Sequence, residues 1–523
     1  MKIMSRRLKI TLLTGIIAVG FLLRAAGLFW GEGYHFSGLT DELLSYRVAL
    51  GLDAGEERAF YIGQPNFKSG KLPGPLWALF WLIGLKIGGS AEAVCAMMIV
   101  LNTVTIYLVY RLAENLLGSA YSLWAALFFA TSPWAVHYSV GSWNPLPMAF
   151  FGALLYLALW DAVTRPNSPN IFWVCLLLAI MPHFHMMVVF VAPVVVLILW
   201  LSRARLNWRW LVAGALASVL LYVPYILGEA RHNWENTRKI LTGNTEPSFA
   251  VLKIFTLPIA NLSNLMNSTT VHEFSAYRAL GDACFGSFWI LAAFNALSLA
   301  LSVVIVSSFL VRLVQSLRGN WLSPRRAFAA VPSDVFIGLL LILPLLLFVS
   351  SFSNFNSRYL IGQFPLLFLL PAMFIVRGLS GPDTQCRGWR KPVRAMIVLT
   401  IVFNVIFSLA YFRYQHERLA RADYFLPSFR KMESVRCQLK ADAGPDCRIR
   451  IDDAPFLKSM PTKYTEEGII SLADYIGLRE QYDPLVSRTQ KVKTYQVRAA
   501  ADKVDTNERA VYATNGVVFV LSK

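Results

Sequence analysis

The sequence contains little charge: lysine, arginine, aspartate and glutamate make up only 15% of its 523 residues. A soluble globular domain carries about a quarter. Its 6 cysteines show no pair spacing of the kind that binds a metal. No Walker loop, dinucleotide-binding glycine pattern or nucleophile elbow occurs in a fitting context. These absences argue against an ordinary soluble domain and give no support to a zinc, nucleotide or serine-hydrolase site.

Long apolar runs are what the sequence has instead. It is 56% hydrophobic with a mean hydropathy of +0.50, and the runs recur from Ile10 to Tyr411. Many approach the roughly 20 residues that a helix needs to cross a bilayer. Backbone polar groups in lipid have no water to bond, so such runs must be helical. The sequence therefore predicts an all-α polytopic membrane bundle.

Eleven segments satisfy both the length of a span and the distribution of charge. They are about 10–30, 91–110, 119–138, 146–163, 171–184, 186–202, 209–228, 286–311, 335–352, 359–376 and 394–412. The two segments beside His183 are short, which suggests broken helices. The apolar stretch 72–88 is left out, because counting it would reverse every later loop. Its Pro73-Gly74-Pro75 start fits a helix that lies at the membrane interface.

The net charge of +18 would fit a nucleic-acid partner, but the basic residues cluster in short loops between apolar runs. When charged residues at the ends of spans are counted with the nearer side and Arg24 is left out, the inside segments carry 18 lysines and arginines against 4 acidic residues. The outside segments before residue 413 carry 11 against 12. Such an asymmetry sets the orientation of membrane proteins. We therefore predict a cytoplasmic N-terminus, a retained first span and no nucleic-acid partner.

Residues 413–523 differ in character, being charged, rich in turn signals and poor in long apolar runs. The alternation in 447–451 predicts a strand, and Asn515-Gly516 between two β-type runs predicts a hairpin. We therefore divide the chain into a transmembrane domain, 1–412, with outside loops 31–90 and 229–285, and a small soluble α/β domain, 413–523, in the periplasm. There a disulfide between Cys437 and Cys447 is expected, whereas in a cytosolic tail both would be free thiols.

The most informative polar feature is the acid pair Asp41-Glu42, just beyond the first span and at the start of an amphipathic helix. The N-terminus of a helix stabilises ionised carboxylates, and a carboxylate there can take a proton from an incoming hydroxyl or amine as a general base. On its own, however, the pair is better explained as a helix cap, with Thr40 or Asp41 as N-cap, because capping is common.

Two histidines, His183 and His185, lie where two short apolar runs meet. Polar residues at membrane depth are candidates for functional sites. At an outside break between helices these imidazoles could bond to phosphate or sugar hydroxyls. A metal pair is the alternative, although nothing nearby supplies further ligands. We predict that one of the two histidines lies near the functional site.

Several short motifs occur in a characteristic order. They are Arg24 in the first span, Asp41-Glu42, Lys71-Leu72-Pro73-Gly74-Pro75-Leu76, Ser132-Pro133-Trp134, Trp143-Asn144-Pro145, and Arg358-Tyr359 followed by Pro365. This order resembles the GT-C superfamily of membrane glycosyltransferases, in particular the bacterial relatives of protein O-mannosyltransferases and lipid A aminoarabinose transferases. The resemblance covers about residues 10–376. Each motif is weak alone, and their order and shared outside placement carry it.

The resemblance implies an enzyme of the bacterial inner membrane that passes a sugar from a polyprenyl-phosphate carrier, usually with inversion, to an acceptor outside the cytoplasm. It assigns Asp41 as the general base. The residues expected to bind acceptor or substrate are Glu42, Asn144, His183, His185 and Tyr359, with metal binding as the alternative for Glu42. Several relatives have a second acid in the next outside loop, where this sequence has Asn144. We therefore predict no obligatory metal, with a divalent cation as the open alternative.

A departing polyprenyl phosphate requires positive charge nearby. Lys68 and Lys71 lie in the first outside loop and Arg358 lies at a turn on the membrane face. We expect these three side chains to hold the phosphate. The alternatives are solvated or headgroup-bound lysines and an arginine that snorkels to the interface. Arg24, in the outer half of the first span, either snorkels or reaches the same phosphate.

Three other functions stay open: a flippase or transporter of lipid-linked sugars, a ligase or polymerase of surface polysaccharide, and an assembly partner without activity. Transporters place polar sites near the bilayer midplane, whereas the polar residues here gather on one face. Ligases usually carry a large loop late in the bundle, whereas the acid pair here lies in the first loop. An inert Asp41→Ala substitution would favour the assembly partner.

Overall fold

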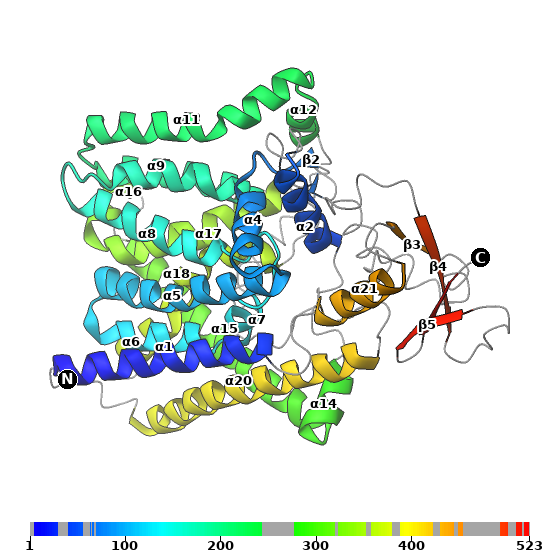
Figure 1. Cartoon of the computed structure of the whole chain (residues 1–523). Coiled ribbons are helices and arrows are strands. Elements are labelled where there is room, and N and C mark those ends of the chain that lie inside the picture. The colour runs from blue at the N-terminus through cyan, green and yellow to red at the C-terminus, as the bar shows by residue number, and fades with distance from the viewer. Residues whose placement is uncertain are drawn as a thin grey trace.

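The structure is a computed structural model, in which the helices of the predicted membrane domain lie side by side with their axes in roughly one direction (Figure 1). The N-terminal helix α1, Arg6–Phe29, begins at one end of this bundle, called the inner end, and finishes at the other, the outer end. The described residues are 5–29, 40–55, 63, 65–66, 70–242, 277–318, 323–351, 357–378, 387–421, 429–443, 448–452, 492–499, 509–514 and 517–521.

Within these residues, six helical segments are long and apolar enough to cross a membrane, and six shorter ones are apolar. The long ones are α1, α5 (Ala91–Leu117), α11 (Trp208–Arg231), α15 (Phe288–Arg318), Leu360–Arg377 and Lys391–Tyr414, the last within α20 (Arg387–Arg421). The shorter ones are α4 (Leu76–Gly88), α6 (Ser119–Thr131), α8 (Met148–Thr164), Ile171–His183, Val188–Ser202 and Pro332–Leu347. Eleven of the twelve coincide with the predicted spans, which confirms a multi-pass membrane protein.

The twelfth segment, α4, is the stretch that the charge distribution excludes from the spans. It packs against α2 (Thr40–Asp53) and against α5 at the outer end, and in Figure 1 it lies across the direction of the spans. Its tryptophans Trp77 and Trp81 are buried, and it ends at Gly89, whose φ of 68° allows a left-handed C-cap. This placement agrees with the predicted interface helix.

Several spans are interrupted rather than continuous. The pair beside His183 consists of α9 (Ile171–Ile180), the 3-10 turns η1 (Met181–His183) and η2 (Met186–Phe190), and α10 (Ala192–Ser202), as predicted. The helix α7 (Pro133–His137) follows α6 after Ser132, which acts as N-cap, with Pro133 in the first position where no donor is needed. The span 357–378 is built from η4 (Ser357–Gln363), α18 (Phe364–Leu367), α19 (Leu369–Met373) and η5 (Phe374–Gly378).

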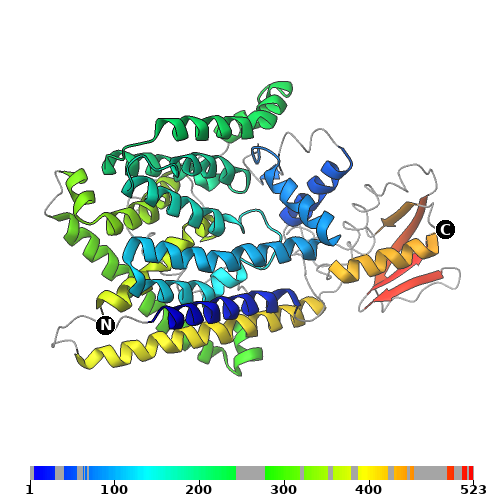
Figure 2. The same ribbon diagram turned by 60° about the vertical axis from the view of Figure 1, so that its left-hand side comes forward.

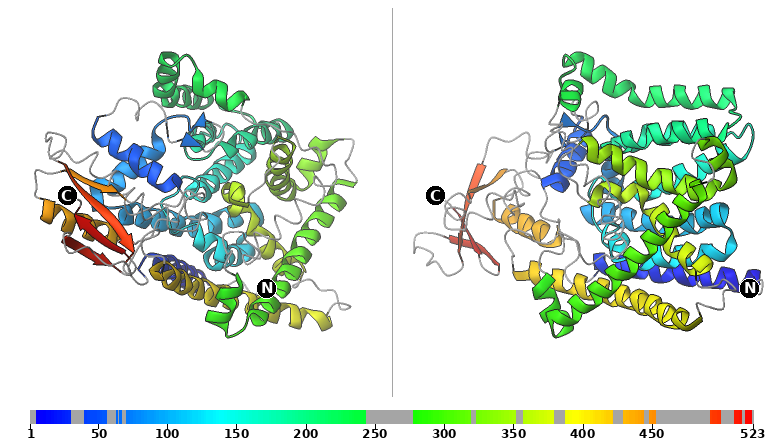
Figure 3. Two further views of the ribbon diagram at one scale, coloured as in Figure 1. Left: turned by 90° about the vertical axis from the view of Figure 1, so that its right-hand side faces the viewer. Right: turned by 180° about the vertical axis from the view of Figure 1, so that it is seen from behind.

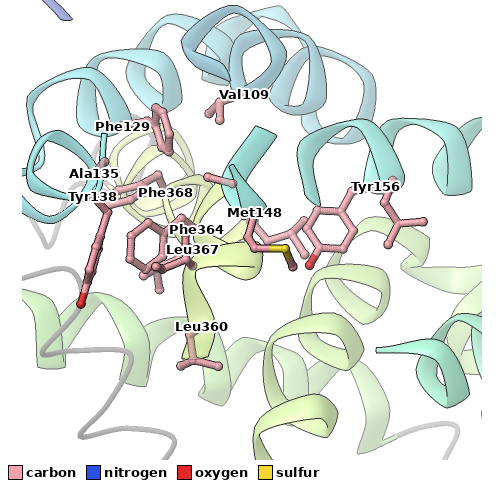
Figure 4. Close-up of a cluster of buried hydrophobic side chains, with 14 of the residues drawn as sticks. Val109, Phe129, Ala135, Tyr138, Met148, Tyr156, Leu360, Phe364, Leu367 and Phe368 are labelled. Atoms are coloured by element: carbon pink, nitrogen blue, oxygen red, sulfur yellow. The ribbon is translucent and has the colours of Figure 1, made fainter. Parts of the chain in front are cut away.

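Aromatic packing fixes these interrupted spans in the middle of the bundle. Phe368 meets the rings of Phe129 and Phe364 edge to face, at centroid distances of 5.7 and 6.1 Å (Figure 4). At Gly152 on α8 a side chain would bring a Cβ within 2.2 Å of the carbonyl oxygen of Gly362. Only glycine therefore allows η4 to approach α8 this closely.

Arg24 is fully buried inside α1. Its guanidinium donates to Ser139 Oγ at 3.0 Å and to the carbonyl oxygens of Gly20 at 2.9 Å and Ala130 at 3.0 Å. Ser132 and Pro133 interrupt the α6–α7 backbone close to these carbonyls, so a cation can satisfy groups that have no helical donor. Both sequence-based expectations for Arg24, snorkelling and phosphate binding, are therefore wrong. It joins the first span to the α6–α7 break.

Shorter elements complete the described part of the bundle. They are α12 (Glu235–Thr242), α14 (Tyr277–Phe285), α16 (Pro324–Ala330), α17 (Pro332–Ser351), and the two-stranded pair β1 (Pro65–Asn66) and β2 (Gly70–Lys71). The elements α2, β2 and α12 lie at the outer end and α16 lies at the inner end (Figure 1). The predicted outside segments that the structure describes here thus share one end of the molecule.

The C-terminal elements lie beyond the same outer end (Figures 2 and 3). Helix α21 (Phe429–Ala443) contacts a four-stranded sheet in the order β3-β4-β6-β5. Its strands are β3 (Arg448–Asp452), β4 (Val492–Ala499), β5 (Arg509–Thr514) and β6 (Val517–Leu521), with β3 parallel to β4 and the other pairs antiparallel. The predicted strand and hairpin are confirmed.

The limits of the predicted C-terminal domain stay a prediction. Helix α20 runs through residue 413 to Arg421, so no break in secondary structure marks the boundary placed there. Cys437 is an exposed free cysteine on α21 and Cys447 lies outside the described residues. The structure thus does not show the predicted disulfide, and the pairing also stays a prediction.

Candidate functional site

The acid pair begins α2 at the outer end. Asp41 is the second residue of this helix, and its side chain lies outside the described part of the structure. The Glu42 side chain is only 1% exposed, and its Oε1 accepts hydrogen bonds from the backbone N–H of Ser142 at 3.2 Å and from Ser142 Oγ at 3.3 Å. The second acid of the pair therefore joins α2 to the segment between α7 and α8.

This segment, residues 139–147, contains the Trp-Asn-Pro motif and is called the WNP loop. Besides Glu42, two side chains from other elements hold its backbone, and one side chain of the loop itself bonds to the helix break. Trp81 Nε1 on α4 donates to the carbonyl of Ser142 at 3.1 Å, and Asn102 Nδ2 on α5 donates to the carbonyl of Leu146 at 3.3 Å. Asn144 Nδ2 donates in turn to the carbonyl of Phe184 at 2.6 Å. The WNP loop is thus tied to α2, α4, α5 and the helix break at 181–190.

His183 and His185 point to different surroundings. The His183 side chain is fully buried against Tyr222 of α11, with ring centroids 4.8 Å apart, and neither ring nitrogen has a hydrogen-bond partner among the described residues. Gly74 lies against this ring: with its φ of +99°, an added Cβ would lie 2.4 Å from His183 Cε1. The glycine of the Pro-Gly-Pro motif is therefore required both by its backbone conformation and by the imidazole.

His185 instead lines a small, partly open cavity of about 20 Å³ between α8, the 181–190 break and η4. The lining residues are Pro145, Met148, Tyr156, Met181, His185, Val188, Val191, Ile361, Gly362 and Gln363. Gln363 is 6% exposed, and its Oε1 has no hydrogen-bond partner in the described part of the chain. Buried polar atoms are nearly always paired, so this carbonyl oxygen needs a donor that the described protein does not supply.

The predicted residues are thus only partly brought together. Asn144 and His185 meet at the 181–190 break, and Pro145 of the WNP loop lines the cavity. Arg358 and Tyr359 belong to η4, whose last residue is Gln363, but their side chains lie outside the described residues. The same holds for the side chain of Lys71 in β2 and for the whole of Lys68. Phosphate binding by these cations stays a prediction.

A second buried carboxylate closes the outer end of α11. Glu229 is fully buried, and its Oε2 accepts from the backbone N–H of Thr237 at 2.6 Å, whereas its Oε1 has no partner among the described residues. The Tyr225 hydroxyl accepts from Asn236 Nδ2 at 2.9 Å and shares a hydrogen bond of 3.1 Å with Thr237 Oγ1. These bonds fold α12 back so that it contacts β2, which carries Lys71.

The sequence-based reading missed Ser142, Gln363 and Glu229. Gln363 is a polar residue inside an apolar run, four positions after Tyr359, and this signal was available from the sequence. Ser142 and Glu229 carried no such signal, because their roles depend on partners that only the fold brings near. Among the described residues no group of three or more histidine, cysteine, aspartate or glutamate side chains is arranged to hold a metal ion. The Asp41 side chain is not among the described residues, so the expectation of no obligatory metal stays a prediction.

Comparison with known proteins adds two findings. The family model described as dolichyl-phosphate-mannose-protein mannosyltransferase matches residues 72–227, whereas the sequence matches no curated protein. Among solved structures, the chain is similar to ArnT from Cupriavidus metallidurans bound to undecaprenyl phosphate, at 11% identity and a TM-score of 0.54, over 97% of each chain. The apo state of ArnT gives the same values.

An oligosaccharyltransferase from Archaeoglobus fulgidus in its apo form is also similar, at 12% identity and a TM-score of 0.48, over 95% of this chain and 70% of that one. The ArnT match extends over nearly the whole length of both chains, and it confirms the fold that the sequence motifs implied. The molecule therefore has the fold of ArnT.

Proposed function

We propose that this protein is a membrane glycosyltransferase that moves a sugar from a polyprenyl-phosphate carrier to an acceptor at the outer end of the bundle. Three observations support the proposal. The mannosyltransferase family model matches the segment that holds the WNP loop and both histidines. The fold is that of ArnT, which was solved with undecaprenyl phosphate bound. The single observation that carries most weight is the cavity at this end, with its unpaired Gln363 acceptor.

The cavity marks the proposed position of the transferred sugar. Its 20 Å³ hold about one water molecule, so its walls must move apart before a sugar ring enters. Small-molecule sites combine mostly apolar walls with a few polar groups that fix orientation, and here His185 and Gln363 are polar among methionine, valine and isoleucine side chains. A sugar hydroxyl is a donor of the kind that Gln363 Oε1 lacks. Helix α2, which carries the acid pair, lies at the same outer end. The proposed cations Lys68, Lys71 and Arg358 belong to predicted outside segments.

The proposed reaction is a direct displacement. A nucleophilic oxygen or nitrogen of the acceptor attacks the anomeric carbon, and the bond between that carbon and the carrier phosphate oxygen breaks with inversion. Asp41 takes the proton of the nucleophile, which contributes rate as general-base catalysis does. Lys68, Lys71 and Arg358 stabilise the charge that develops on the departing polyprenyl phosphate. A cytoplasmic N-terminus would place this reaction, and the C-terminal sheet, in the periplasm.

Reconstitution into liposomes with a polyprenyl-phosphate-linked sugar and an acceptor fraction from the cell envelope tests the proposal. Asp41→Asn should lower transfer by about 10²- to 10⁴-fold, the usual range for a general base. Asp53→Asn is the matched control, because Asp53 lies at the other end of α2 in an exposed ion pair with Lys86, Nζ to Oδ1 2.5 Å. Full transfer by both Asp41→Asn and Asp41→Ala would contradict the assignment of Asp41.

The same assay separates the enzyme from a flippase. Transfer releases one free polyprenyl phosphate for each sugar moved, whereas a flippase returns the intact carrier on the other side of the membrane. Labelling of single cysteines at positions 40–42 from either side of the vesicle locates the acid pair. Labelling from the cytosolic side alone would end the proposal.

A further inference from the structure

We propose that Glu42 is a positioning residue, which sets the WNP loop above the cavity and does not itself touch acceptor or metal. The inference rests on the proposed function, since it assigns a role within the same site. It begins from the direction of the Glu42 carboxylate, which points at the backbone of Ser142, 100 positions later in the chain. Glu42 is 1% exposed and is absent from the residues that line the cavity.

The hydrogen bonds of Glu42 are suited to holding a backbone in place. A single carboxylate oxygen receives both the N–H and the hydroxyl of Ser142. Hydrogen bonds to an ionised acceptor are roughly twice as strong as neutral ones, and removing the acceptor would leave a buried N–H without this partner. Gly141 also lies against the carboxylate, since an added Cβ there would be 3.7 Å from Glu42 Oε1. The start of the WNP loop is thus shaped around this side chain.

The position of the backbone that Glu42 holds affects the cavity at two neighbouring points. Two residues after Ser142, Asn144 donates to the carbonyl of Phe184 at 2.6 Å, and the next residue, Pro145, lines the cavity. Phe184 in turn precedes His185, which also lines the cavity. Both lining residues therefore depend on where the WNP loop lies. Because Asp41 precedes Glu42 on α2, the same bond also sets the distance between the proposed base and the sugar.

The test compares Glu42→Gln, Glu42→Ala and Ser142→Ala in the full-length protein, with Asp53→Asn as the control on the same helix. Glutamine keeps a carbonyl oxygen that can accept from the Ser142 N–H, whereas alanine does not. Hydrogen exchange of the peptide that contains residues 140–146 reports the loop directly. Transfer from the polyprenyl-phosphate-linked sugar reports its consequence, as kcat and as KM for the donor.

We expect Glu42→Ala to lose exchange protection in the loop and to lower kcat by about 100-fold, as a misplacement of about 1 Å can. Glu42→Gln should keep the protection and transfer within about threefold of the parent protein, and Ser142→Ala should lie between them. A Glu42→Gln variant that keeps the protection but is as inactive as Glu42→Ala would overturn the inference, because the charge itself would then act on acceptor or metal. Unchanged loop protection in Glu42→Ala would overturn it as well.

Failure of the proposed function gives a different result. In that case the parent protein transfers no sugar from any donor, while the exchange experiment still decides whether Glu42 holds the WNP loop. Loss of fold in Glu42→Ala is recognised by loss of exchange protection throughout the bundle. The comparison of Glu42→Gln with Ser142→Ala then decides the question, since the first keeps the backbone bond and the second removes only the hydroxyl.

Discussion

Buried and part-buried carboxylates have different partners at the two ends of the bundle. At the inner end, three part-buried carboxylates each meet a cation at close range: Glu114 with Lys9 at 2.6 Å, Asp161 with Arg165 at 2.8 Å, and Asp334 with Arg377 at 2.8 Å. At the outer end, the fully buried carboxylates of Glu42 and Glu229 accept from backbone N–H groups of Ser142 and Thr237. The ion pairs described at that end, Asp53 with Lys86 and Glu235 with Lys239, are solvent-exposed.

Unpaired polar atoms show the same contrast. Among the described residues of the outer end, both ring nitrogens of His183, Gln363 Oε1 and Glu229 Oε1 are buried without a hydrogen-bond partner. At the inner end Arg325 Nε is in that state, but its guanidinium lies over the Trp200 ring at 4.3 Å. Charge pairing at one end stabilises the fold. Neutral pairing at the other end leaves polar capacity for a ligand, as expected of a functional face.

The largest effect on stability is expected at the inner end. Asp334→Ala removes both carboxylate oxygens from Arg377 Nη1, each 2.8 Å away, and leaves a half-buried cation without this partner. The cost should be about 3 kcal/mol, the lower limit for breaking a buried pair, because Arg377 is partly exposed. Unfolding in mixed detergent micelles measures it. Glu235→Ala, which breaks the exposed pair with Lys239, should change stability by less than about 0.5 kcal/mol.

A smaller effect is expected at the outer end. Glu229→Ala leaves the buried N–H of Thr237 without its acceptor, which should cost about 2 kcal/mol. Glu229→Gln keeps an acceptor for this N–H and should cost less than half as much. The same unfolding experiment applies. If glutamine destabilises as strongly as alanine, the negative charge of Glu229 itself contributes to stability. The outer end would then rely on charge as the inner end does, which would contradict the contrast between them.

The smallest effect concerns Gly74 and His183. Gly74→Ala should cost about 1–2 kcal/mol, because it combines a backbone of positive φ with a Cβ that overlaps the imidazole. Gly89→Ala is the matched control, since Gly89 has a φ of +68° and no atom within 4 Å of an added Cβ. Adding His183→Ala should relieve only the part that exceeds the control. Purely additive effects in this double-mutant cycle would show that the two residues do not touch.

Most of the bundle was predictable from the sequence because hydropathy and charge asymmetry act over whole segments. The eleven spans follow from the length of the apolar runs, and the break around His183 follows from the polar residues that interrupt them. The exclusion of 72–88 follows from the charge distribution, because one more span would reverse the side of every later loop. The strand at 448–452 and the hairpin that ends at Leu521 follow from alternation and a turn signal. In each case the pattern that carries the information lies within one stretch of the chain.

The site was predictable only as a region. The bonds of Glu42 with Ser142, of Asn144 with Phe184, and of Arg24 with Ala130 join residues 40 to 106 positions apart. No local pattern specifies such partners. Arg24 was therefore wrongly expected to snorkel or to reach the carrier phosphate, and Glu42 was expected to bind acceptor or metal. Asp41, Lys68, Lys71 and Arg358 have side chains outside the described residues, and their roles stay predictions.

The burial of Arg24 has a consequence for biogenesis. When α1 leaves the ribosome, its guanidinium has no protein partner except its own helix, and the carbonyls that satisfy it belong to residues more than one hundred positions later. An arginine at the centre of an isolated helix raises the free energy of insertion by about 2.5–3.5 kcal/mol, and Arg24, in the outer half of α1, is expected to raise it by less. The first helix should therefore settle at its final depth only after α6 and α7 have entered the membrane, and truncated chains that end before residue 129 should be handled as substrates of quality control.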